Sequence, residues 1–214
     1  MPSISLNLML QNLSKFLTCI IFLYFLWMGS HNLEAEAIFQ QDDHCLAYQT
    51  EETIFLFINS IVIGKTCEIS THVEREAGNT RFLVSFPISS LDSGLEMRDD
   101  DVTDMLTVES NTDIRFVSDF LTEEQILAAL SHGKANLWGM LEIRGKFYKV
   151  MFPLMLSEDS GKWLVTGSLV SSISKFDLEL PSVLGGVIAD TRDQLKLLVH
   201  LRFNLVQGLP EFNQ

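Results

Sequence analysis

Apolar and polar residues alternate along most of this chain, and the alternation predicts strands. Between residues 81 and 88 apolar side chains recur at every second position, and the same spacing returns at 114–120, 134–143 and 194–205. This period of two is typical of a strand with one buried face. Further strands are expected at 46–49, 53–59, 66–75, 146–156 and 162–171. The run 53–59 is apolar at nearly every position, as in a strand that is covered on both faces.

Two short helices are expected between these strands. The first runs to about Leu106, with Asp92 or Ser93 as its N-cap. The second opens with the capping-box spacing of Thr122 and Gln125 and ends at 132–133. Hairpin connections dominate, and no repeat of strand and helix is visible. The pattern therefore predicts an all-β fold, an antiparallel barrel or sandwich of about eight strands, rather than a parallel α/β fold.

A motif follows the strand at 81–88. The turn 90–94 reads Ser-Leu-Asp-Ser-Gly, Arg98-Asp99 comes next, and Ile114-x-Phe116 follows the helix. This order resembles the signature of the YceI-like family, in which a strand leads into a Ser-Ile-Asp-Thr-Gly turn, an Arg-Asp helix and a strand ending in Ile-x-Phe. The stretch from Gly139 is similar to the family's Gly-x-Leu-Thr-Ile-x-Gly hairpin, and the tail from Phe176 resembles its closing loop and last strand.

The resemblance spans roughly residues 45–206 and implies a lipocalin-like antiparallel barrel that is exported from the cytoplasm. It also implies a non-enzymatic protein that holds a polyisoprenoid, quinone or similar long-chain lipid in the barrel lumen. Arg98 and Asp99 are expected near the mouth, where they orient the turn or contact a ligand head group. The residues expected to line the lumen are Phe82, Val84, Phe86, Ile114, Phe116, Phe120, Leu141, Ile143, Leu197, Val199, Leu201 and Phe203; Phe55, Phe57, Phe147 and Phe152 are expected on the same apolar inner face.

The interior of such a barrel has two readings. Closing about eight strands leaves a space that side chains fill or that holds one small ligand. Most aromatic stripes belong to ordinary cores, so a secreted or cell-envelope interaction module with a filled core is the alternative to the lipid carrier.

The first 37 residues have the pattern of a secretory signal peptide. Lys15 precedes an apolar run from 16 to 28, and 35–37 is a small-x-small cleavage site. The apolar run is shorter than the roughly 20 residues that a membrane-spanning helix needs. We therefore expect residues 1–37 to be removed, a mature domain of residues 38–214 and a periplasmic or secreted location. A retained anchor is the alternative.

Two cysteines, Cys45 and Cys67, remain after cleavage. An even number of cysteines in an oxidising compartment is compatible with a disulfide, and two reduced, buried thiols are equally compatible with the sequence.

Composition excludes several other functions. The chain has a formal net charge of −13, whereas binding to nucleic acid or to an anionic membrane by charge needs a basic patch. The histidines at 44, 72, 132 and 200 stand alone and are expected to be exposed, and the acidic run 99–101 suits the first turns of a helix. We expect no catalytic site, metal or cofactor. The expected partner is a long-chain isoprenoid or other lipid; a homodimer and a transient membrane contact are further partners to consider.

Overall fold

The computed structural model describes residues 38–55, 57–108, 111–159, 162–180, 182–183 and 189–207. The expected signal peptide lies outside the described residues. Residues 41–214 form one compact unit, distinct from residues 1–40. In the described part of the chain, no helix has the length and apolar character needed to cross a membrane.

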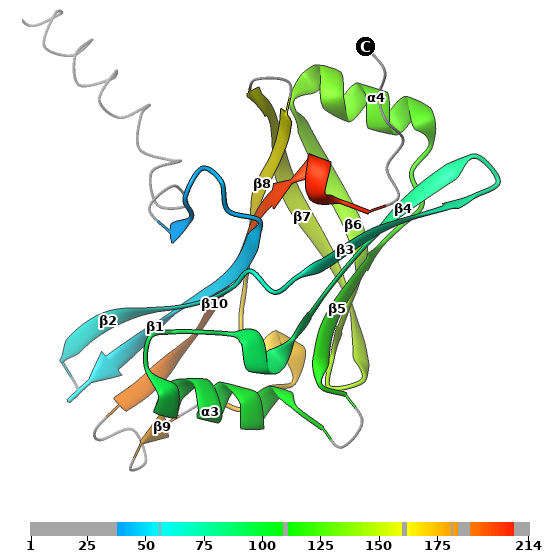
Figure 1. Ribbon diagram of the computed structural model, residues 1–214. Helices are drawn as coiled ribbons and strands as arrows, with labels where there is room; N and C mark the ends of the chain where they lie inside the picture. Colours follow the sequence, from blue (N-terminus) through cyan, green and yellow to red (C-terminus); the bar gives the residue numbers. More distant parts are fainter. Residues whose placement is uncertain are drawn as a thin grey trace, which may run out of the picture. The chain divides into compact units, whose positions relative to one another are not determined.

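Nine antiparallel strands form one continuous sheet in the order β2-β1-β10-β8-β7-β6-β5-β4-β3 (Figure 1). The short β9 pairs with β10 outside this path. The strands are β1 (Cys45–Ile54), β2 (Ile58–Thr66), β3 (Ser70–Glu76), β4 (Asn79–Pro87), β5 (Asp113–Ser118), β6 (Lys134–Ile143), β7 (Lys146–Asp159), β8 (Lys162–Ser171), β9 (Ser182–Val183) and β10 (Ala189–Arg202). Two α-helices, α3 (Glu96–Leu106) and α4 (Glu123–His132), and three 3-10 turns, η1 (Ile88–Ser90), η2 (Ser174–Phe176) and η3 (Phe203–Leu205), complete the fold.

The sheet is strongly curled, but it stays open along one seam. Within the described residues, the end strands β2 and β3 share no ladder. Other segments occupy their edges: Lys65 of β2 exchanges backbone hydrogen bonds with Asp92, and Val73 of β3 donates its backbone N–H to Gln207. The predicted all-β antiparallel fold with two short helices is confirmed, and the sheet forms a half-barrel.

The apolar run 53–59 is not a strand covered on both faces, so that prediction is wrong. β1 ends at Ile54 and β2 begins at Ile58, and Phe55, with a φ of 49°, and Phe57 lie in turn conformation between the two strands. A positive φ interrupts an extended strand. Phe55 and Phe57 are exposed at this turn instead of facing the interior, and Phe147, beside the β6–β7 turn, is exposed as well.

The two helices begin in different ways. α4 has the predicted capping box: Gln125 donates its backbone N–H to the Thr122 hydroxyl, and the side chain of Gln125 accepts from the Thr122 backbone. The N-cap of α3 is Leu95, without a side-chain bond, so the expected capping by Asp92 or Ser93 is wrong. The Asp92 carboxylate instead accepts the N–H of Gly94, which shapes the turn before the helix.

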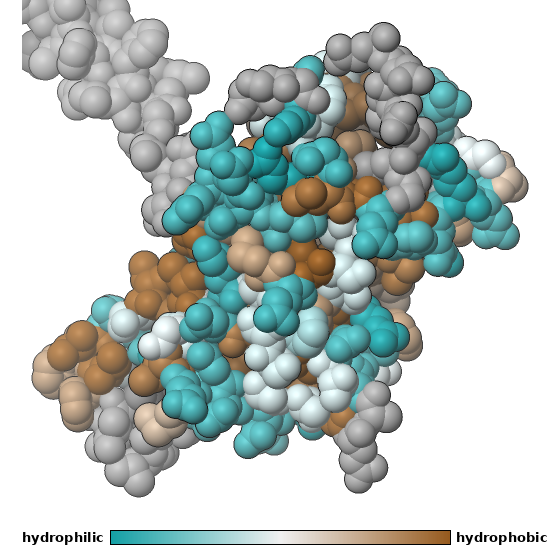
Figure 2. Space-filling model, in the orientation of Figure 1, coloured by the Kyte–Doolittle hydropathy of each residue, from teal (hydrophilic) through white to brown (hydrophobic). Residues whose placement is uncertain are grey.

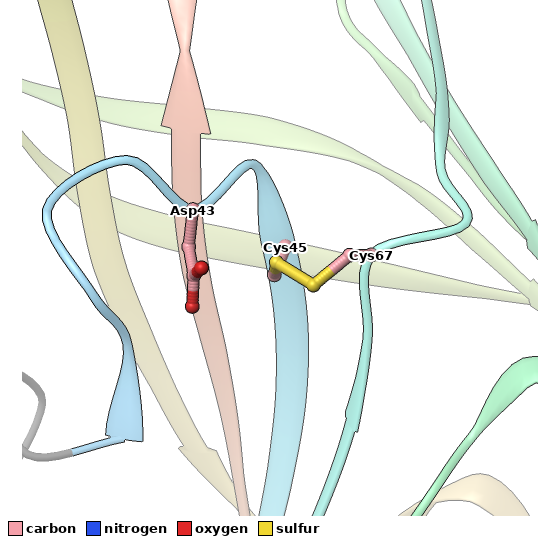
Figure 3. A group of neighbouring side chains, drawn as sticks. All are labelled: Asp43, Cys45 and Cys67. Carbon is pink, nitrogen blue, oxygen red and sulfur yellow. A yellow bond between two sulfur atoms is a disulfide. The ribbon is translucent and has the colours of Figure 1, made fainter.

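A disulfide joins Cys45, at the start of β1, to Cys67, directly after β2 (Figure 3). It resolves the alternative left open by the sequence. Closing a loop between residues 22 positions apart stabilises the fold by roughly 3 kcal/mol in the chain-entropy account. The Asp43 carboxylate lies within 4.8 Å of both sulfurs, but the sulfurs are bonded to each other and the carboxylate accepts from the Lys65 ammonium. This group is therefore a structural cluster rather than a metal site.

Two of the four histidines predicted to be exposed are not. His200, on β10, is 7% exposed and its Nδ1 is hydrogen-bonded to the backbone oxygen of Asp43. His44 is half-buried, and its Nδ1 accepts the backbone N–H of Arg202 at 3.0 Å while its Nε2 faces the Thr71 hydroxyl. Burial above all, and then the positive charges of His200 and Arg202, lower the pKa of His44 below 6.5. Folding therefore favours the neutral form of the His44 imidazole over the protonated form.

This pKa shift predicts a loss of stability in mild acid. Below about pH 6.5 the unfolded chain takes up a proton at His44 more readily than the folded protein does, so the free energy of unfolding should fall as the pH drops through this range. Urea titrations near pH 7.5 and 5.5 measure the effect. The fall should be smaller in His44→Gln than in the wild type, because the variant lacks the imidazole whose pKa is lowered on folding. Equal pH dependence of His44→Gln and the wild type would contradict the prediction.

Candidate ligand-binding cavity

The curled sheet surrounds a cavity of about 1000 Å³. Its volume is at the upper end of the range of roughly 300–1000 Å³ found for small-molecule sites. Strands supply most of the wall, and α3 and α4 contribute side chains from opposite ends of the sheet (Figure 1). Most of the residues in the wall are apolar.

The predicted lumen residues, with the exception of Phe120, are in this wall. They are Phe82, Val84, Phe86, Ile114, Phe116, Leu141, Ile143, Leu197, Val199, Leu201 and Phe203. Their contact with a ligand remains a prediction. Phe120 is not a wall residue, because β5 ends at Ser118 and the alternation of the strand does not reach it. Its ring is exposed, with the guanidinium of Arg81 4.8 Å from the ring centroid.

The last strand shows that its inner face borders a hollow. Leu197 and Val199 of β10 are only partly buried, although they point to the interior, whereas Leu198 and His200 beside them are 1% and 7% exposed. A close-packed interior would bury the inward-facing Leu197 and Val199 fully. The inner face of β10 therefore retains surface that a ligand can cover.

A compact apolar cluster borders part of the cavity. Ile88 of η1 and Phe176 of η2 are each 1% exposed and form its centre, together with residues of α3, β5, β6 and β7. The ring of Tyr148 meets Phe176 edge-on, and the Tyr148 hydroxyl donates to the Phe176 backbone oxygen at 2.7 Å. Ordinary core packing thus holds the wall in place next to the hollow part.

A glycine allows one aromatic ring of the wall to lie close to the sheet. The rings of Phe116 and Phe152 meet edge-on, with centroids 5.5 Å apart. A Cβ atom at Gly139 would lie 2.5 Å from Phe116 Cζ, so a side chain at this position would displace the ring.

An ion pair between α3 and β1 is part of the wall. Nη2 of Arg98 lies 3.2 Å from Oε1 of Glu52, and the two side chains are 28% and 14% exposed. Arg98 thus faces the cavity, as expected for the mouth. Asp99 does not: its carboxylate accepts the backbone N–H of Ser93 at 2.9 Å, so it orients the turn before α3.

Tyr48 brings a polar atom into the wall that has no hydrogen-bond partner among the described residues. Its hydroxyl is buried, and its ring covers Gly64 on the neighbouring strand, where any side chain would overlap the ring. Burial, followed by the negative charge of Asp99, raises the pKa of Tyr48 to about 12, with Arg98 acting in the opposite direction. The hydroxyl is protonated at physiological pH and keeps its hydrogen-bond donor.

Tyr48 and Glu52 were missed in the sequence reasoning. Tyr48 alternates with Leu46 and Thr50 on one face of the first strand, and this spacing was the available signal. No sequence pattern marks Glu52 as a wall residue, because it lies next to the apolar run 53–59, which predicts a separate strand.

A curled antiparallel sheet around an apolar cavity places this protein in the class of barrel-like all-β proteins. Residues 49–203 match the YceI-like domain, and the chain belongs to this family. The search of curated protein sequences found no match.

Solved structures also resemble the chain. The crystal structure of Burkholderia cenocepacia BcnA is 19% identical, covers 74% of this chain and 95% of its own, and has a TM-score of 0.54. A structure from Saccharophagus degradans, described as a polyisoprenoid binding domain, is 12% identical, with coverages of 73% and 92% and a TM-score of 0.49. A Campylobacter jejuni YceI protein is 13% identical, with coverages of 65% and 82% and a TM-score of 0.49. The BcnA likeness supports the fold.

Two tyrosine variants test whether the Tyr48 hydroxyl is unpaired. Tyr48→Phe should leave the free energy of unfolding unchanged or raise it by up to about 1–3 kcal/mol, because it removes a buried group without a partner. Tyr148→Phe should lower the free energy of unfolding by about 1 kcal/mol, because it removes a formed hydrogen bond. Guanidinium unfolding of both variants provides the comparison. A loss for Tyr48→Phe as large as that for Tyr148→Phe would contradict the assignment.

Proposed function

We propose that this protein is a non-enzymatic carrier that holds a long-chain lipid, such as a polyisoprenoid or a quinone, in its cavity. The observation that carries the proposal is the cavity of about 1000 Å³ with predominantly apolar walls. Membership of the YceI-like family supports it. An apolar chain in such a cavity would be held by burial, worth about 25 cal/mol for each Å² removed from water. An acidic protein can bind a lipid in this way, because the hydrocarbon chain of the lipid carries no charge.

The polar residues of the wall indicate which end of a lipid they would meet. The Tyr48 hydroxyl is a donor without a partner among the described residues, and Arg98 has further N–H groups beyond the one that faces Glu52. Both favour an acceptor oxygen, such as a quinone carbonyl or an alcohol. Because Glu52 offsets the charge of Arg98, the ion pair favours an uncharged polar end over a diphosphate. We propose this group of three as the head-group site.

The carrier proposal predicts opposite results for neighbouring residues of β5. Phe116→Ala should reduce lipid binding, because the ring forms part of the wall. It should cost clearly less than the roughly 3–5 kcal/mol of a fully packed phenylalanine, because Phe116 is only partly buried. Arg115→Ala should leave lipid binding and the free energy of unfolding unchanged, because the Arg115 side chain is 59% exposed. The measurements are the free energy of unfolding and the lipid extracted by organic solvent and identified by mass spectrometry.

Two results would contradict the carrier. One is repeated absence of lipid from protein prepared from the native host. The other is wild-type lipid content in a Phe116→Ala variant that is fully destabilised. Either would favour the interaction module with a filled core.

The proposed carrier works outside the cytoplasm. The Cys45–Cys67 disulfide is the structural feature that supports this location, because disulfides persist in oxidising compartments. Protein isolated from its host should begin at Ile38 and have a mass two units below that of the reduced form. Retention of residues 1–37 on membrane-bound protein would contradict the cleaved signal peptide, and labelling of both thiols without reductant would contradict the disulfide.

A further inference from the structure

The turn between β1 and β2 presents large apolar side chains to solvent. Phe55 is 55% exposed, Phe57 78% and Ile58 48%. Figure 2 shows hydrophobic surface gathered at the end of this hairpin. Phe55 has a positive φ, and Phe57 donates its backbone N–H to Ile54, so both phenylalanines belong to the turn at the hairpin tip. Exposed apolar patches on soluble domains commonly mark a contact with a protein or a membrane.

This hairpin lies at an end of the cavity that reaches the surface. Leu95 and Met97, at the start of α3, are wall residues and are also 45% and 68% exposed. Leu180, in the segment before β9, is a wall residue with 40% exposure. β9 pairs with the start of β10, which pairs with the end of β1, and the Arg98–Glu52 ion pair ties α3 to β1. Apolar surface therefore continues from the hairpin into the cavity.

The charges around this opening are mostly negative. Asp101, Asp104 and Glu179 are exposed residues of the cavity wall, and Arg144 is the exposed cation among the wall residues described. Attraction to anionic lipid needs clustered lysine and arginine, which this rim does not provide. A surface of zwitterionic lipid carries no net charge and suits an acidic rim with a protruding apolar tip.

We infer that the β1–β2 hairpin tip, with Phe55 and Phe57, docks on the surface of a zwitterionic lipid bilayer, and that lipid passes between bilayer and cavity beside Leu95, Met97 and Leu180. The inference rests on the proposed carrier function. It adds the surface from which a water-insoluble cargo is collected or to which it is delivered. A projecting tip beside the opening brings the cavity and the bilayer into contact, so the chain need not cross water.

The test compares a double variant at the tip, Phe55→Ser with Phe57→Ser, with the control Trp138→Ser. Trp138 is a 50% exposed aromatic residue of β6 that is not part of the wall. Flotation with phosphatidylcholine vesicles, with and without phosphatidylglycerol, measures docking. Transfer of a fluorescent isoprenoid alcohol from these vesicles measures delivery, and uptake of farnesol from dilute solution measures the cavity alone.

Wild-type protein and Trp138→Ser should float with phosphatidylcholine vesicles, and more weakly when phosphatidylglycerol is added. The tip variant should lose at least about tenfold in vesicle binding and in transfer rate, because it lacks the two phenylalanine rings that would leave water on docking. Its uptake of farnesol should equal that of the wild type.

The outcomes separate the two proposals. Farnesol uptake without vesicle binding by the wild type, or equal binding by the tip variant, would overturn the docking site and leave the carrier intact. Self-association that depends on the tip, without vesicle binding, would replace the bilayer with a second copy of the chain. Tip-dependent vesicle binding without uptake of any isoprenoid would support docking and overturn the carrier.

Discussion

The antiparallel ladder between β1 and β10 holds the first and last strands of the described domain together, and the remaining features depend on it. It runs from Cys45 paired with His200 to Ile54 paired with Ala189. Strands at opposite ends of a sequence pair only after a long chain has closed on itself, so this contact is entropically expensive. The disulfide, the His44–Arg202 bond and the His200–Asp43 bond all gather near one end of the ladder. The two histidine bonds connect the segment before β1 to β10, and the disulfide connects β1 to the end of β2.

The same ladder places the polar group of the cavity. β1 carries Tyr48 and Glu52, and its position next to β10 and β2 brings both residues toward the start of α3, where Arg98 completes an ion pair. An isolated charge in an apolar wall would be costly, whereas a charge with a neighbour of opposite sign is tolerated. Tyr48 avoids the cost in another way: its phenol is neutral at physiological pH, and burial raises its pKa further, to about 12. The cavity therefore offers hydrogen bonds with little net charge.

The features that can be predicted from the sequence are those that depend on the period-two alternation of strands or on a short local motif. The inner-face residues of β4, β5, β6 and β10 were predicted because one alternation places a whole strand. The capping box of α4 was predicted because it needs only two residues three positions apart. The predictions for Phe120 and for the run 53–59 are wrong because each extends a strand past its end. Alternation does not state where a strand ends, and a backbone turn at Phe55 leaves no trace in hydrophobicity.

The rest depends on contacts between distant parts of the chain. His200 was expected to be exposed because it alternates with the inner face, and its burial comes from the segment around Asp43, which lies over the outer face of β10. The pairing of Glu52 with Arg98 spans 46 positions and has no local signature. Neither can be inferred from residue spacing, because each requires the path of the chain in three dimensions.

A hollow interior changes how the fold is stabilised. Side chains that border a cavity lack neighbours on one side and lose part of the dispersion attraction of a packed core. In this domain the compact cluster around Ile88 and Phe176, the long strand ladders and the disulfide are the features that offset this loss. A ligand that filled the cavity would restore the missing contacts. It would stabilise the folded state in proportion to the logarithm of the ligand concentration. Stability and ligand occupancy would then be linked through the same apolar surface, which includes the partly buried inner face of β10.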